Sequence, residues 1–127
     1  IIMKKIDINT PFRVNNIEIT PIRILHGKLP IAGYRIGNMA YLTDVSLIPE
    51  EEYTKLKDLD LLIMGALRWE KHPSHQSIDE AIEKAQHINA RQTYFIHFSH
   101  NLGLHHEAET KLPTNIHLSY DKLELTI

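Results

Sequence analysis

Several side chains that could bind a metal ion stand where a predicted strand ends. His26 follows ITPIRIL, Asp44 follows AYLT, and His97 follows TYFI, while His75 closes the turn segment HPSH. A rigid strand delivers an imidazole or a carboxylate to a common sheet edge with little positional freedom. Imidazole and carboxylate together suit Zn, Mn or Fe. One aspartate among histidines is also what a carboxylate bridging two cations would look like.

Each of these residues also has an ordinary structural interpretation. His26 precedes Gly27 and could be a loop residue, and Asp44 could form a turn or cap a helix. A histidine near a helix start, such as His72 or His75, is usually just solvated. His75, however, would lie near exposed backbone amides, where anions bind well.

The pair formed by His97 and His100 is the strongest single signal, because an H-x-x-H just beyond a strand is a recurrent ligand arrangement. The remaining histidines lack such a setting, and we expect most of them at the surface: His87, His105, His106 and His117. Of these, His105 and His106 stay candidates for minor roles. Nine histidines in a chain without cysteine are a further reason to look for a metal.

Length and composition limit the classes of protein to consider. The chain has 127 residues, 43% hydrophobic and 24% charged, as in an ordinary globular domain, and we expect one domain at most. A net charge of −2 predicts no electrostatic binding to nucleic acid or to an anionic membrane. The absence of cysteine excludes disulfides, thiolate ligands and thiol nucleophiles from this chain. Neither a signal-peptide pattern nor an apolar run near 18 residues occurs, and we expect a cytoplasmic protein.

The first half of the chain is rich in strand signals. Residues 17–25 alternate in hydrophobicity, and Pro21 within them predicts a bulge or an edge position. Segments 32–37 and 38–44 predict a hairpin that turns at Gly37-Asn38. A short helix is expected over 49–57, because Pro49 precedes an acidic first turn and the last turn is basic.

The second half alternates strands and helices. Residues 58–67 form an apolar run typical of a strand buried on both faces. Ser77 and Glu80 form a capping box before a helix with one apolar face, and 91–97 predicts another strand. A last short helix is expected over 102–110, and 116–127 is expected to form a hairpin or two short strands.

This order of elements predicts an α/β fold, with helices on one face of the sheet. So many apolar strand residues need cover on the other face too, and we expect a second sheet there.

The chain resembles the metallo-β-lactamase fold, in the branch similar to the carbon–phosphorus lyase accessory phosphodiesterase. The resemblance covers residues 11–127 and is carried by co-linear segments in the family's order: ITPIRILHGKLPIAGYRIG, YLTDVS, LLIMGALRWEKHPSHQSIDEA, YFIHFSHNLGLHHE and LPTNIHLSYDKLEL. It implies the C-terminal half of an αββα sandwich (α+β by layer), with 1–127 a single partial domain. It also implies a hydrolase of small or cyclic phosphodiesters, with two divalent cations (Mn, Zn or Fe) and a metal-bound hydroxide as nucleophile.

The resemblance assigns a role to each matched position. It implies that His26 is a ligand of one metal, that Asp44 bridges both metals, and that His97 is a ligand of the second. His75 matches the histidine that contacts the substrate phosphate and protonates the leaving group, so it is not expected to be a ligand. His100 matches the second histidine of the family's T-H-x-x-H, with a supporting role, and His72 is a further candidate for support.

Two departures from the family pattern stand out. The H-x-H-x-D-H run, which supplies the other ligands, does not occur in these 127 residues and belongs to the family's N-terminal half. Near the end, the family's Y-D-G-L is Y-D-K-L, with Lys122 in place of a glycine. A half of such a sandwich would expose one apolar sheet face.

Three interpretations stay open. The chain is part of a phosphodiesterase of about twice this length and inactive alone, or a non-catalytic half-domain that self-associates through the bare sheet, or an α/β binding module whose histidines coincide by chance. A hydrolase of another ester or thioester class on this fold also stays open, because a fold does not fix a function. The expected partners are a small phosphodiester and the N-terminal half of the same protein or a second copy of this chain.

Overall fold

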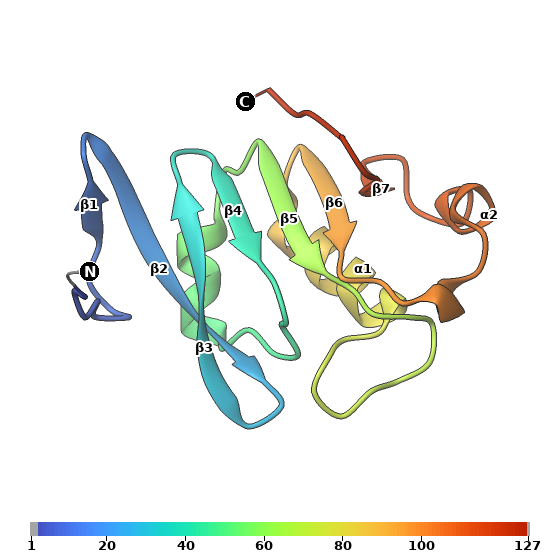
Figure 1. The fold of residues 1–127 in the computed structure, drawn as a ribbon, viewed down its shortest axis with the longest axis horizontal. Coiled ribbons are helices and arrows are strands. Elements are labelled where there is room, and N and C mark those ends of the chain that lie inside the picture. The colour runs from blue at the N-terminus through green and yellow to red at the C-terminus, as the bar shows by residue number, and fades with distance from the viewer. Residues whose placement is uncertain (1–2, 127) are drawn as a thin grey trace.

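The computed structural model describes residues 3–126 and is built on one seven-stranded sheet. The strands are β1 (Phe12–Val14), β2 (Ile17–His26), β3 (Leu29–Ile36), β4 (Met39–Leu42), β5 (Leu61–Gly65), β6 (Gln92–Ile96) and β7 (Ile116–Leu118). They pair in chain order, antiparallel from β1 to β4 and parallel from β4 to β7 (Figure 1). Strand β2 therefore runs in the same direction as β4, β5 and β6, and the carboxyl ends of these strands share one edge.

Tight turns fix the antiparallel part of the sheet. The turn at Gly37-Asn38 is confirmed, with Gly37 at φ 56°, a conformation that glycine adopts without steric strain. Strand β3 begins at Leu29, so only Gly27 and Lys28 separate it from β2. The edge position predicted for Pro21 is also confirmed, because β1 pairs with β2 only as far as Ile19.

The helices are short. The expected helix over 49–57 is the 3₁₀ helix η1 (Glu50–Leu56), and the helix expected over 102–110 is split into η2 (His100–Leu102) and α2 (His105–Glu109), with Gly103 at φ 96° between them. Helix α1 (Ile78–Ile88) starts at the predicted capping box. Within residues 3–126, no helix is long and apolar enough to cross a membrane.

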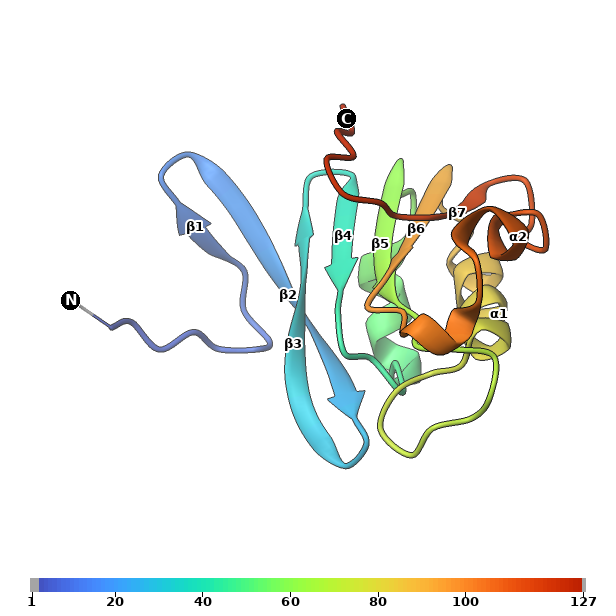
Figure 2. The same ribbon diagram turned by 45° about the vertical axis from the view of Figure 1, so that its right-hand side comes forward.

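One face of the sheet carries the core. Helix α1 lies behind β5 and β6 in Figure 1, and η1 lies behind β3 and β4; in the turned view of Figure 2 both helices remain on the same side of the sheet. The strands send alternate side chains to this face, and these pack with the helices in one cluster that includes Ile22, Ile24, Leu42, Leu62, Met64, Ile78, Phe95 and Leu118. This arrangement confirms a mixed α/β architecture with the helices on one side.

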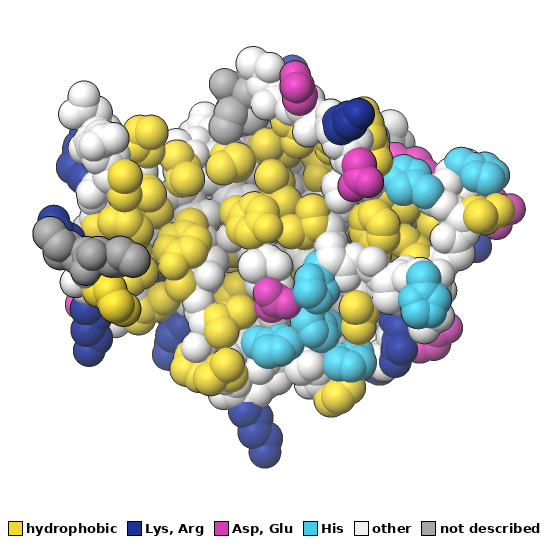
Figure 3. All heavy atoms as spheres, viewed as in Figure 1, with side chains coloured by type: hydrophobic (Ala, Val, Ile, Leu, Met, Phe, Trp, Pro, Cys, Tyr) yellow, Lys and Arg dark blue, Asp and Glu magenta, His cyan; other side chains and the backbone are white. Residues whose placement is uncertain are grey.

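The opposite face of the sheet is apolar and open. Side chains from β1 to β4 line a hydrophobic surface hollow there: Phe12, Ile19, Tyr34, Ile36, Met39 and Tyr41. Hydrophobic side chains spread across this face in Figure 3. Residues 3–126 contribute no second sheet to cover it. The second sheet that we expected on this side is not formed by the described residues.

The strands differ from expectation in two places. The three-residue strand β1 was not predicted, because Phe12–Val14 is too short to show periodicity. The C-terminal hairpin expected over 116–127 reduces, in the part up to residue 126, to the single strand β7. The chain turns instead after β7, where Leu123 N donates to Tyr120 O (3.1 Å) and Lys122 takes φ 67°.

Candidate metal centre

The four side chains singled out for metal chemistry meet at the carboxyl edge of the sheet. His26 is the last residue of β2, Asp44 follows the end of β4, and His97 directly follows β6. His75 comes from the loop between β5 and α1. In Figure 3, a group of histidines surrounds a carboxylate beside the apolar face.

Asp44 lies at the middle of this group. Its Oδ1 is 3.5 Å from His97 Nε2 and 4.0 Å from His75 Nδ1. Potential ligand atoms of His26, Asp44 and His75 all lie within 4.8 Å of one another. His26 Nδ1 lies 3.1 Å from the backbone oxygen of Asp44, which can only accept, so Nδ1 carries the proton and Nε2 is left to coordinate.

The imidazoles form a packed cluster with His75 at its centre. The His75 ring centroid is 4.5 Å from that of His26 and 4.8 Å from that of His97, and the His97 ring is stacked on it at 22°. Burial lowers the pKa of His75 from its ordinary value, and His26 and His97 lower it further, while Asp44 acts in the opposite direction. His75 therefore favours the neutral form that a metal ligand or a proton acceptor needs.

Asp44 and His97 share an uncommon backbone conformation. Their φ angles are 54° and 64°, in the left-handed region that few residues other than glycine occupy. Gly65 lies between them at the end of β5, where a Cβ would be 3.1 Å from Asp44 N and 3.8 Å from His97 Cβ. Such conformations cluster at functional sites. The pattern of residue types gave no signal for them.

Of the two histidines expected to have a supporting role, His72 lies beside the cluster and His100 is exposed on η2. His72 lies beside the cluster, 5.2 Å from His75 between ring centroids, and accepts a hydrogen bond from Ser74 N (3.3 Å). His100 begins η2 and is exposed. His75 was not expected to be a ligand, yet its position would also permit coordination, and its role stays a prediction.

Two of the other histidines make local contacts. His117 lies half-buried between the side chains of Glu109 and Gln92, at 3.0 Å from each. His105 contacts the backbone oxygen of Ser119 (3.1 Å). These contacts hold the segment around α2 and β7 and give His117 a structural role.

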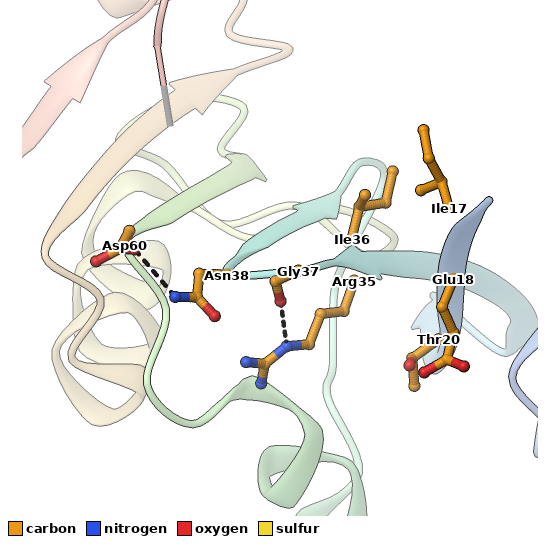
Figure 4. A pocket seen from close by; sticks show the side chains of 8 residues that line it. All are labelled: Ile17, Glu18, Thr20, Arg35, Ile36, Gly37, Asn38 and Asp60. Atoms are coloured by element: carbon orange, nitrogen blue, oxygen red, sulfur yellow. Dashed lines mark hydrogen bonds between the residues drawn. The ribbon is translucent and has the colours of Figure 1, made fainter.

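A hollow of about 750 Å³ lies at the opposite edge of the sheet, near the start of β2 and the turn before β4 (Figure 4). Two of its polar side chains are already hydrogen-bonded to the backbone or to each other. Arg35 Nε donates to Gly37 O (2.8 Å), and Asn38 Nδ2 donates to Asp60 Oδ2 (3.1 Å). The hollow contains no imidazole, so it has no part in the metal centre.

The donor set at the carboxyl edge fits a divalent transition metal. Imidazole nitrogens and a carboxylate converge, a backbone carbonyl fixes the tautomer of His26, and His75 favours its neutral form.

Comparisons with known proteins agree with this fold. Residues 2–98 match the family described as the beta-lactamase superfamily domain. The chain is 47% identical over 118 residues to an octanoyltransferase of Porphyromonas gingivalis, across 92% of this chain and 24% of that protein.

Solved structures give the same picture. A diphosphatase from the PhnP family is 38% identical with a TM-score of 0.89, across 92% of this chain and 46% of that one. Zn²⁺-bound PqqB from Methylobacterium extorquens has the same fold, with a TM-score of 0.74 at 13% identity, across 98% of this chain and 55% of that one. The chain thus spans about half of the similar diphosphatase and about a quarter of the curated relative. It belongs to the beta-lactamase superfamily domain family, and its sheet and helices correspond to one half of a metallo-β-lactamase fold.

Proposed function

We propose that this chain supplies one half of the active site of a metal-dependent hydrolase that cleaves phosphodiesters. The observation that carries the proposal is the position of the Asp44 carboxylate, which lies among imidazoles from two strand ends and a loop. A carboxylate with imidazoles on both sides is suited to hold two cations close together.

Three residues would hold the cations. His26 would hold one cation and His97 the other, and Asp44 would serve both. When bound, a cation pair lowers the pKa of water and neutralises charge on phosphoryl oxygens. The protein's part is to fix the donors, which it does with strand ends and the bond from His26 Nδ1 to the Asp44 carbonyl.

His75 would bind the substrate phosphate and protonate the leaving oxygen. The pKa of this imidazole is lowered by burial and by its histidine neighbours, so it needs help to carry a proton near neutral pH. An anionic phosphate within a few ångströms provides that help, because a nearby opposite charge favours the protonated form. His75 would then take up a proton from solvent when the substrate binds and transfer it to the leaving oxygen.

The similar diphosphatase supports a phosphorus–oxygen bond as the target. Small or cyclic phosphodiesters are the substrates we propose, and a diphosphate linkage is the second candidate, favoured by the 38% identity to that enzyme. The name octanoyltransferase belongs to a protein of which the chain matches only 24%, and does not assign a reaction to the matched part.

The open sheet face requires a partner in this proposal. We propose that a second sheet, from the N-terminal half of the same protein, packs on it and brings the remaining metal ligands. The similar diphosphatase is matched over only 46% of its length, which leaves room for such a half. A second copy of this chain is the alternative occupant, and it would give a non-catalytic dimer.

Elemental analysis and hydrolysis of bis(p-nitrophenyl) phosphate test the proposal. Both are measured on this chain and on the protein encoded by the complete gene. We expect two metals per chain and diesterase activity in the complete protein, with little activity in the 127 residues alone. Absence of metal from both proteins would contradict the proposal and favour the self-associating half-domain, which size-exclusion chromatography would reveal as a dimer.

A further inference from the structure

Gln76 is a buried polar side chain beside the metal centre. It directly follows His75, and only 1% of its surface is exposed. Burying an amide is unfavourable unless it is hydrogen-bonded. Among the described residues only its nitrogen has a partner: Nε2 donates to Gly65 O at 2.6 Å, whereas Oε1 is buried without one. Because a carbonyl only accepts, the bond to Gly65 fixes which way the amide points.

The acceptor of this bond occupies a central place. Gly65 ends β5, the strand between β4 and β6, whose ends lead to Asp44 and His97. A Cβ on Gly65 would lie 3.1 Å from Asp44 N and 3.8 Å from His97 Cβ, so the glycine backbone fits closely between the two residues. The amide of Gln76 therefore attaches to the part of the sheet edge that separates them.

The backbone of Gln76 is held at the same edge. Its N–H donates to Val45 O (3.2 Å), one residue after Asp44, and its carbonyl accepts from Leu67 N (3.1 Å), two residues after Gly65. These bonds close the loop that carries His75. Together with the side-chain bond, they give the residue after His75 three attachments to the strand ends.

We propose that Gln76 is a positioning residue that holds the His75 imidazole against Asp44 and His97 through its hydrogen bond to Gly65. The inference rests on the proposed function, in which His75 contacts the substrate. A displacement of about 1 Å in such a group can lower a rate roughly 100-fold, so a loss of this bond that shifts His75 even slightly would lower turnover.

Histidine NMR tests the positional part without any need for activity. The signals of His75 and His97 are assigned with His75→Ala and His97→Ala, at a pH high enough to keep all imidazoles neutral. Gln76→Met keeps the size of the side chain but cannot donate to Gly65. We expect it to reduce the ring-current shifts that stacking gives His75 and His97, while the matched variant Gln86→Met, at an exposed glutamine of α1, leaves them unchanged.

A double-mutant cycle in the complete protein tests the functional part. Gln76→Met should lower kcat/KM about tenfold or more, with metal content nearly unchanged. In the His75→Ala background it should have no further effect, because the group it positions is gone. A loss of equal size in both backgrounds would overturn the proposal, since it would show a general structural effect.

The two tests separate the possible failures. A complete protein without activity would contradict the proposed function, and the NMR comparison would still decide the position of His75. Unchanged His75 and His97 signals in a folded Gln76→Met would overturn the role of Gln76. If Gln76→Met does not fold, Gln76→Asn, whose shorter amide cannot reach Gly65, takes its place. Failure of both variants to fold would assign Gln76 to the core and overturn the proposal.

Discussion

Asp44 Oδ1 lies 3.5 Å from His97 Nε2, and both residues hold a left-handed backbone conformation at the ends of two strands separated by β5. This conformation is strained for any residue with a Cβ, although aspartate and histidine adopt it more readily than β-branched residues do. The pair thus combines side-chain proximity with backbone strain, which is expected where function selects geometry over stability.

The bridging role predicted for Asp44 can be tested with Asp44→Asn, because asparagine also tolerates a positive φ and keeps the size of the side chain. In the complete protein we expect loss of one metal per chain and of most diesterase activity, since a neutral amide cannot hold two cations. Metal content and hydrolysis are measured together. Retention of full activity would show that Asp44 does not bridge.

His75→Gln should separate proton transfer from metal binding. We expect turnover to fall by roughly 100-fold, as is common when a general acid is removed, while the metal content stays at two per chain. The geometry also permits His75 to coordinate, because its ligand atom lies within 4.8 Å of those of His26 and Asp44. A fall in metal content with His75→Gln would therefore identify it as a ligand.

The stability of the chain should depend on pH through His75. Burial and the neighbouring His26 and His97 lower the pKa of this group below its ordinary 6.5. The unfolded chain therefore binds a proton before the folded chain does, so this contribution is fully present above pH 6.5 and is lost as the pH falls toward the lowered pKa.

Urea denaturation of the 127-residue chain, carried out at several pH values on both sides of 6.5, checks this expectation. His75→Gln should make the free energy of unfolding less dependent on pH in the acidic range. His106→Gln, at an exposed histidine of α2, should keep the original dependence. An unchanged slope in His75→Gln would mean that its imidazole is solvated.

Lys122→Gly should stabilise the chain. Lys122 has φ 67° in the turn after β7, a backbone conformation that glycine adopts without strain. A residue with a Cβ is disfavoured there by roughly 1 kcal/mol. We therefore expect a free energy of unfolding higher by about that amount, measured by urea denaturation.

The comparison for this variant is Lys28→Gly, at the exposed second residue of the turn between β2 and β3. It should lower stability slightly or leave it unchanged, because there glycine only adds freedom to the unfolded chain. A loss of stability in Lys122→Gly would show that the lysine side chain makes a contact that outweighs its backbone strain.

The sequence predicts the main parts of this structure for identifiable reasons. The apolar run before Gly65, the capping box at Ser77 and the strand before His97 are local signals, and each appears where expected. The convergence of His26, Asp44 and His97 could be predicted because each follows a strand, and strands that run in the same direction end at one edge of the sheet. The strand ends could be read from hydrophobic periodicity, which requires no knowledge of tertiary contacts.

Other features depend on tertiary structure and could not be predicted in this way. The positive φ of Asp44 and His97 occurs beside Gly65, at the ends of neighbouring strands, and the bond from Gln76 to Gly65 joins residues from different elements. The expectation of a C-terminal hairpin was wrong because the alternation of residues in 116–127 gives no signal for a left-handed turn at Lys122.

The order of the strands has a consequence for synthesis. Because β1 to β7 pair in the order in which they occur in the chain, each strand leaves the ribosome beside a partner that has already been made. Translation at roughly 5–20 residues per second gives each antiparallel pair of β1 to β4 ample time to form before the next strand emerges. His97 is the last of the four clustered residues to be translated, so nascent chains shorter than this hold an incomplete set of metal donors. The donors that we propose for the metals are thereby brought together only after β6 has joined the growing sheet.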